Sequence, residues 1–253
     1  MMRVRPLPGR SQRGFSLLEL AVVLLVLGLL TWGGSSAFGN VGAVRERDLA
    51  SRSAEALQQA LRAFALQNAR LPCPDLTGQG WEGNAAGQCP AGAEAGWLPY
   101  RALGLELPPP ALQAAYSVYR NTLAPGGDAD LAVRTERTGD APSSASYQDV
   151  RDLIVGLNRA QAAGPSASHT RLTGDTAGEG AIDCSANLRS NPAYWLVIPL
   201  QDRDQNGDRF DSVHALNFSC AYSPGTAVTV ARDDVVRADT LATLAGWLAA
   251  SAS

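Results

Sequence analysis

A long apolar run dominates the hydrophobic pattern near the start of the chain. No charged side chain occurs from Leu20 to Val44, a length that spans roughly 37 Å as a helix at 1.5 Å per residue. A bilayer core is about 30 Å thick, so the run is long enough to cross it once. The pattern therefore predicts a transmembrane helix segment over residues 15–44.

From Arg45 onward the predicted helix becomes amphipathic. Apolar residues recur at steps of three and four and make one stripe, formed by Ala50, Ala54, Leu57, Leu61 and Phe64. The polar face carries Arg45, Arg47, Arg52, Glu55, Gln58, Gln59 and Arg62. We expect residues 45–69 to form a second helix half that ends near Asn68 and packs on a globular head. A free coiled-coil stalk is the alternative, but the stripe covers only about two heptads.

Residues 70–253 carry the shorter patterns of an exported globular head. Gly-rich and Pro-rich loops are predicted at residues 71–110 and 163–181, strands at 116–120, 132–134, 194–200, 214–222 and 227–231, and helices at 147–162 and 241–249. Together with the long N-terminal helix, these elements predict the α+β class. The helix is expected to pack on a small antiparallel β-sheet.

Glu19 lies at the start of the apolar run and needs a physical reason. A carboxylate at the centre of a membrane helix costs roughly 2.5 to 3.5 kcal/mol on insertion scales, and such residues usually face a partner. Glu19 is therefore a candidate functional residue.

The stretch RGFSLLELAVVLLVLGLL, residues 13–30, resembles the processing segment of type IV pilins and type II secretion pseudopilins. It has a basic leader, then Gly14 and Phe15, with Glu19 at the fifth position of the mature chain. The resemblance implies that a prepilin peptidase removes leader residues 1–14 by cutting after Gly14, and that the new amine of Phe15 is N-methylated. It also implies a pilin-like fold and assembly with other pilin or pseudopilin subunits.

The expected role of Glu19 agrees with its physical chemistry. A buried carboxylate is costly unless it is paired, and the Phe15 amine of a neighbouring subunit is a suitable cation. The segments LPCPD (residues 71–75) and GWLP (residues 96–99) are also similar to segments of large pilin-like proteins. The size of the head favours a minor subunit over the bulk subunit, while a type IV pilus and a type II secretion filament fit equally well.

The charge distribution predicts the orientation in the membrane. Four arginines and no acidic residue lie in the leader, so it is expected in the cytoplasm, with the chain crossing the inner membrane once and the head in the periplasm. Without the leader, 17 arginines stand against 24 acidic residues, a net charge of −7. This balance argues against a general nucleic-acid-binding surface.

Two alternatives use the apolar run without filament assembly. An ordinary secretory signal is cleaved after small residues, and Ser35-Ser36-Ala37 offers such a site before Phe38. The run also serves equally as a simple anchor. The alternative to a filament subunit is therefore a signal-anchored or secreted periplasmic or surface binding protein or enzyme, which uses residues 15–44 as an anchor or signal and does not assemble into filaments.

The four cysteines lie in the head, at Cys73, Cys89, Cys184 and Cys220. An even number in an exported domain predicts two disulfides. Sequence order favours pairing the first two and the last two, although three connectivities are possible. A zinc site is the alternative, but the chain has no C-x2-C pair.

An acidic loop offers oxygen ligands at alternate positions around Gly207. The predicted calcium ligands are Asp202, Asp204, Asn206, Asp208 and Asp211. The first half matches D-x-[DN]-x-[DN]-G, but Val213 holds the twelfth position where an EF-hand has an acid. Calcium would be structural here, and a solvated turn is the alternative.

Enzyme motifs are missing from the sequence. There is no G-x-S-x-G or H-E-x-x-H motif, and the Gly-rich stretch at residues 173–180 lacks the lysine of a P-loop. His169 and His214 are expected to be surface or half-buried residues rather than catalytic bases. The sequence therefore predicts a protein with no catalytic residues and no required cofactor.

Overall fold

The structure is a computed structural model of the 253-residue chain. It describes residues 17–120, 129–140, 148–174, 182–214, 219–229 and 231–252, without the side chains of residues 29–41. The regular elements are α1 (Leu17–Asn68), β1 (Ala95–Trp97), the 3-10 helix η1 (Pro110–Leu112), β2 (Ala115–Val118), α2 (Val150–Ala162), β3 (Arg171–Thr173), β4 (Leu188–Ser190), β5 (Pro192–Ile198), β6 (Cys220–Tyr222), β7 (Val235–Thr240) and α3 (Leu241–Ser251). Two units, Met1–Glu46 and Arg47–Ser253, are described separately.

The second unit contains two sheets. The larger has the order β1-β2-β5-β7, and each neighbouring pair is antiparallel. The smaller has the order β4-β3-β6, in which β3 pairs antiparallel with β4 and parallel with β6. The predicted α+β class, with a long N-terminal helix and an antiparallel sheet, is confirmed. The smaller sheet was not predicted.

The amphipathic half of α1 packs on the head through its apolar stripe. Ala50, Ala54, Leu57 and Leu61 are buried in the main core, as predicted. Ala65 takes the next inward position in place of Phe64, whose half-buried ring lies 5.1 Å from the Arg70 guanidinium. The helix ends at Asn68 because Ala69 adopts a left-handed φ of 53°.

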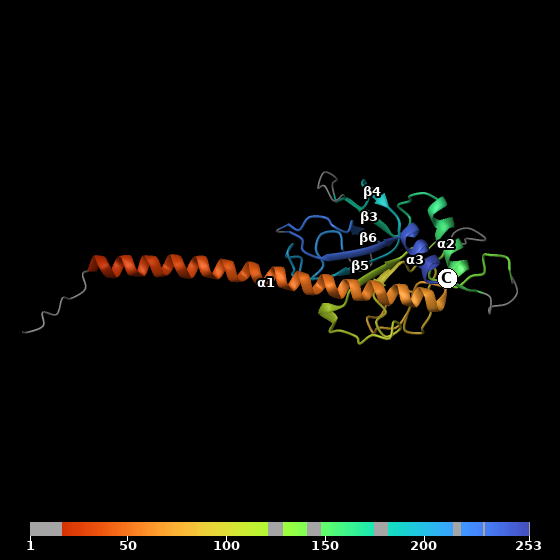
Figure 1. Cartoon of the computed structure of the whole chain (residues 1–253), viewed down its shortest axis with the longest axis horizontal. Coiled ribbons are helices and arrows are strands. Elements are labelled where there is room, and N and C mark those ends of the chain that lie inside the picture. Colours follow the sequence, from red (N-terminus) through yellow and green to blue (C-terminus); the bar gives the residue numbers. More distant parts are fainter. Residues whose placement is uncertain are drawn as a thin grey trace, which may run out of the picture. The chain divides into compact units, whose positions relative to one another are not determined.

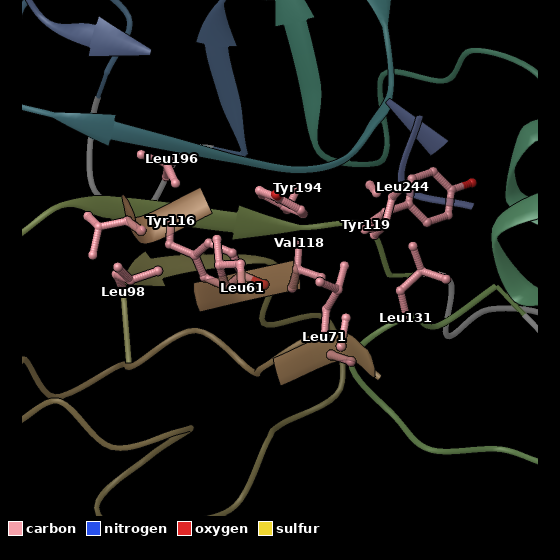
Figure 2. Packing of buried hydrophobic residues seen from close by; sticks show 14 of the residues in the cluster. Leu61, Leu71, Leu98, Tyr116, Val118, Tyr119, Leu131, Tyr194, Leu196 and Leu244 are labelled. Atoms are coloured by element: carbon pink, nitrogen blue, oxygen red, sulfur yellow. The ribbon is translucent and has the colours of Figure 1, made fainter. Parts of the chain in front are cut away.

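The larger sheet is buried on both faces. Alternate residues of a strand point to opposite faces, and Tyr116, Val118, Tyr194 and Leu196 join the core that contains Leu61 of α1 (Figure 2). Trp195 and Val197, on the other face of β5, belong to a second core with residues of the smaller sheet. Figure 1 accordingly shows β3, β4 and β6 on one side of β5 and α1 on the other. This double burial explains why residues 194–200 are almost entirely apolar.

Helices α2 and α3 lie side by side at one end of the head (Figure 1). The α2 helix begins at Val150 because Asp149 caps it, with the Asp149 carboxylate accepting the Arg151 N–H at 2.8 Å. Thr240 caps α3 in the same way through the Thr243 N–H, at 3.0 Å. The predicted helices are thus present, although residue 147 lies outside the described residues.

Several predicted boundaries were wrong. Residues 132–134 form no strand, and the predicted loop at 71–110 contains β1 and ends at the first residue of η1. In the region predicted as a strand at 214–222, the described strand is β6, and the chain turns just before this region at Ser212, which has a left-handed φ of 64°. Residues 215–218 lie outside the described residues.

The most informative error concerns β7. The sequence predicts a strand at 227–231, where the described residues show only an isolated bridge from Thr229 to Arg232. The true strand is β7, and Arg237 and Asp239 interrupt its apolar pattern. Both side chains contact α1. The charged residues that made β7 unrecognisable as a strand in the sequence are therefore the residues that bind the strand to the helix.

Asp239 holds the centre of this contact, and its residue surface is only 2 % exposed. Its carboxylate accepts two hydrogen bonds from Arg62, at 2.6 and 2.8 Å, and one from Gln58 Nε2 at 2.9 Å. The Tyr194 hydroxyl donates a fourth, at 2.5 Å. Burial, followed by the charge of Asp239, raises the pKa of Tyr194 and keeps this donor protonated. The cluster joins α1, β5 and β7.

We predict that Asp239→Ala destabilises the protein by about 3 kcal/mol, because Arg62 and the Tyr194 hydroxyl lose their acceptor. Asp48→Ala is the matched control, since Asp48 pairs with Arg52 on the exposed part of the same helix, and its cost is less than about 0.5 kcal/mol. Denaturant unfolding of the full chain in detergent measures both. Equal losses of stability in the two variants contradict the prediction.

Candidate functional site

The N-terminal candidate residues lie at the start of α1. Gly14 and Phe15 are outside the described residues, and Glu19 lies in the first turn of the helix. In this unit, taken by itself, large apolar side chains are exposed, with Leu17 at 88 % and Leu25 at 64 %. Contiguous exposed apolar surface is typical of a protein or membrane contact.

The predicted membrane segment has one further structural test. Among the described residues, no helix is both long and apolar enough to cross a membrane. Residues 29–41 fall inside the predicted segment, and their side chains lie outside the described part of the chain.

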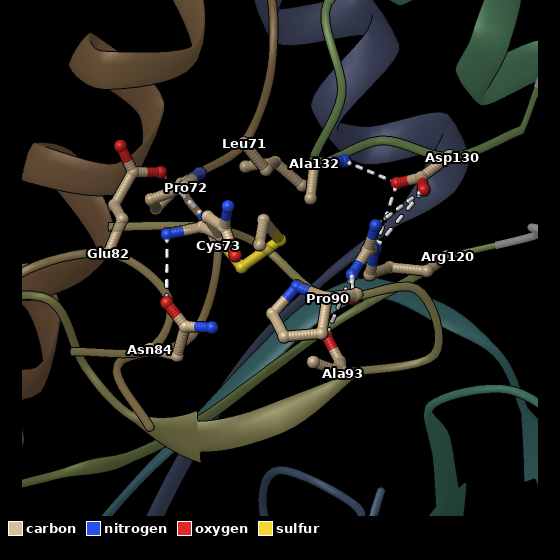
Figure 3. Close-up of a disulfide and its surroundings, with 12 residues drawn as sticks. Leu71, Pro72, Cys73, Glu82, Asn84, Pro90, Ala93, Arg120, Asp130 and Ala132 are labelled. Atoms are coloured by element: carbon tan, nitrogen blue, oxygen red, sulfur yellow. Dashed lines mark hydrogen bonds and ion pairs between the residues drawn. A yellow bond between two sulfur atoms is a disulfide. The ribbon is translucent and has the colours of Figure 1, made fainter. Parts of the chain in front are cut away.

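Cys73 and Cys89 form the first disulfide, directly after the long helix, as sequence order favours. Figure 3 shows Glu82 on one side of it and the Arg120–Asp130 ion pair on the other. Glu82 accepts the Cys73 N–H at 2.7 Å and pairs with Arg70 at 2.6 Å, while the buried Arg120 pairs with Asp130 at 2.8 Å and donates to the Pro90 carbonyl. These contacts fix both ends of the disulfide-closed loop on the head.

The two segments that resemble large pilin-like proteins meet in space. The N–H of Asp75 donates to the Trp97 carbonyl, and the Trp97 N–H donates back to the Asp75 carbonyl, each at 2.9 Å. A Cβ at Gly96 would lie only 2.7 Å from the Asp75 carbonyl oxygen, so this approach requires glycine. The segments 71–75 and 96–99 therefore act as one structural unit.

Cys184 and Cys220 form the second disulfide, which also follows sequence order. It fastens the segment before β4 to β6 in the smaller sheet. The described residues contain no free cysteine, so the alternative zinc site has no thiolate ligands.

The acidic loop brings together three of its five predicted ligands. Carboxylate oxygens of Asp202, Asp204 and Asp211 lie within 4.8 Å of one another. Asn206 and Asp208 each accept a backbone N–H within the loop, from Asp208 at 2.9 Å and from Phe210 at 2.7 Å, as Asp202 and Asp204 also do. The loop therefore presents an open group of three acids, two of them exposed.

Two further acids near this loop were missed in the sequence. Asp233 and Asp234 precede β7 and form a second group with Asp211, again within 4.8 Å, in which all three residues are buried. Burial raises the pKa of Asp211 and of Asp234. In the sequence, the only sign of these residues is that two adjacent acids precede an apolar segment. Their closeness to the acidic loop arises only from the fold.

His214 is buried, contrary to the expectation of a surface or half-buried residue. Its Nδ1 lies 2.7 Å from Asp234 Oδ2, and its Nε2 accepts the Tyr222 N–H at 3.3 Å. This pattern assigns the proton to Nδ1 and leaves neither nitrogen open to a metal ion or a substrate. His169 is half-buried, as expected, with Nδ1 3.4 Å from Glu94.

These donors fit a hard divalent cation. Both groups of acids offer only oxygen, the cysteines are in disulfides and His214 is fully engaged. Calcium takes six to eight oxygen ligands and tolerates irregular geometry. The chemistry of the residues thus agrees with the calcium predicted for the loop.

Residues 9–35 match the family model of the prokaryotic N-terminal methylation motif. Gly14, Phe15 and Glu19 all fall within the match, which covers a small part of the chain. The segment is a prepilin segment of the type IV pilin and pseudopilin kind, and it indicates a processed precursor. No curated protein and no solved structure matches the chain.

Proposed function

We propose that this protein is a non-catalytic structural subunit of a type IV pilus or a type II secretion filament. The methylation motif at residues 9–35 carries the proposal. It lies at the start of a helix that reaches Asn68 and whose later part is built into the head. A subunit assembled through its N-terminal helix needs that attachment, because the helix must carry the head with it.

The proposed processing starts in the inner membrane. The chain spans the membrane once, with its basic leader in the cytoplasm and its head in the periplasm, until it enters the filament. Prepilin peptidase cuts between Gly14 and Phe15, and the Phe15 amine is N-methylated. Within the filament, the Glu19 carboxylate pairs with the Phe15 amine of a neighbouring subunit and sets the axial register.

The size of the head supports a minor subunit. The globular part extends from residue 70 to the end of the chain, which is a large volume to repeat along a crowded shaft. A place at the tip or in initiation suits such a head. The other pilin or pseudopilin subunits are then its partners.

The mature N-terminus separates this proposal from a signal-anchored binding protein or enzyme. We predict that mass spectrometry of the membrane-extracted protein finds a chain that begins at N-methylated Phe15. A chain that begins at Phe38 contradicts the filament proposal and supports an ordinary secretory signal.

We predict that Glu19→Ala leaves membrane insertion intact but reduces incorporation into filaments at least tenfold, because the Phe15 amine of the next subunit loses its counter-ion. Sheared filament fractions and membrane fractions, both probed with an antibody to the head, measure the two quantities. Asp48→Ala is the control on the exposed surface of the same helix and retains incorporation. Unchanged incorporation of Glu19→Ala removes the proposed role of Glu19.

The proposal includes a structural calcium ion in the loop, held through Asp202, Asp204 and Asp211. The ion would screen the repulsion among their carboxylates and hold the loop after β5. We predict that calcium raises the melting temperature of the chelator-treated full chain by several degrees, and that Asp204→Ala reduces this rise. No shift in the wild-type protein contradicts the presence of a calcium site.

A further inference from the structure

We propose that Asp211, Asp233 and Asp234 form a second divalent-cation site, buried beside the loop site and sharing Asp211 with it. The site is independent of filament assembly and differs from the loop site in its ligands. Asp211 comes from the end of the acidic loop, whereas the other two residues come directly before β7.

The three carboxylates converge in the interior of the head. One oxygen from each lies within 4.8 Å of the others, and the exposed residue surfaces are 0 % for Asp211, 6 % for Asp233 and 1 % for Asp234. Burying several like charges together is costly unless a cation compensates them.

An oxygen of Asp234 supplies a second, independent observation. Its Oδ2 accepts hydrogen bonds from His214 Nδ1 at 2.7 Å and from the Asp211 N–H at 2.9 Å. Its Oδ1 is buried and has no hydrogen-bond partner among the described residues, on a side chain that is 0 % exposed. A buried carboxylate oxygen without a donor is costly, and a bound cation would satisfy it.

The other two carboxylates retain coordination capacity. The Asp211 carboxylate accepts the backbone N–H groups of Arg203 and Asp233, each at 2.8 Å, and a further backbone hydrogen bond from Asp204. Asp233 accepts the Gln201 N–H at 3.2 Å and the Arg203 side chain at 2.6 Å. A carboxylate has about four lone-pair positions, so each group keeps positions for a metal ion.

The neighbouring positive charges leave the group negative. Arg203 is the arginine that forms an ion pair with the group among the described residues, and Arg47 donates to the backbone carbonyl of Asp233 at 2.9 Å. His214 donates through Nδ1 only. Three carboxylates therefore face one directly paired guanidinium, which favours a divalent cation.

The identity of the donors selects a hard cation. All are carboxylate oxygens, which suit calcium and magnesium, and calcium accepts the irregular, mixed coordination that backbone-bonded carboxylates offer. Calcium is therefore the expected ion. Its binding would join the end of the acidic loop to the start of β7.

The test counts ions in the chelator-treated full chain in detergent, by equilibrium dialysis against calcium chloride, with magnesium chloride as the competing salt. We expect two calcium ions per wild-type chain. Asp233→Asn and Asp234→Asn each lose the buried ion and bind one, as does Asp204→Asn, which loses the loop ion. Asp211→Asn binds none, because it removes the shared ligand. Asp48→Asn, an exposed acid of α1 that belongs to neither group, keeps both ions.

The outcomes separate the two sites. The buried site is overturned if Asp233→Asn and Asp234→Asn bind as many ions as the wild type, or if the wild type binds a single ion that Asp204→Asn abolishes. The buried site is supported if Asp204→Asn still binds one ion and both Asp233→Asn and Asp234→Asn lose that ion. This result supports the buried site even if the loop binds no calcium. Near-UV circular dichroism without calcium tests whether each variant is folded. If Asp234→Asn is unfolded, the ion count of Asp233→Asn alone tests the buried site.

Discussion

The ionic contact at Asp239 is the constraint on which the head depends. A carboxylate buried in an apolar sheet is stable only with several donors, and it receives them from two residues of α1 and from Tyr194 of β5. These hydrogen bonds hold α1 against the sheet and also fix its position along the sheet. Apolar packing of Leu57 and Leu61 is compatible with a small sliding motion, whereas the bidentate Arg62 pair is not. The long helix and the head portion of the chain are thereby one body from Arg47 onward.

Local periodicity was enough to predict the elements with a single hydrophobic pattern. The stripe of α1, the doubly buried strand β5 and the inward leucines of α3 follow from spacing alone. Strand β7 could not be predicted in this way, because Arg237 and Asp239 are inward-facing charges whose partners lie about 180 residues earlier. For the same reason, Gln58 and Arg62 were assigned to the polar face. They border the apolar stripe and bind the sheet.

The same distinction between local and long-range patterns applies to the candidate sites. The methylation motif is contiguous, so the sequence alone was enough to predict roles for Gly14, Phe15 and Glu19, which lie within the matched residues 9–35, and the two disulfides follow the order of the cysteines. The acidic loop was recognised by its spacing, but the spacing did not indicate the two further acids that lie close to Asp211. Asp233 and Asp234 come from the segment before β7 and reach Asp211 only in the folded chain. Residues that come together only in the folded protein show no spacing pattern in the sequence.

Both ends of β7 carry buried acids with different requirements. Asp239, at the end of the strand, is satisfied within the chain by Arg62, Gln58 and Tyr194. Asp233 and Asp234, before its start, have fewer donors and one unpartnered buried oxygen. A cation bound there would compensate the negative charge at the start of β7, as Arg62 of α1 does at its end. Since Arg47 also donates to the Asp233 carbonyl, the strand is held to α1 near both ends, and the filled site would order the loop on the edge strand that faces the helix.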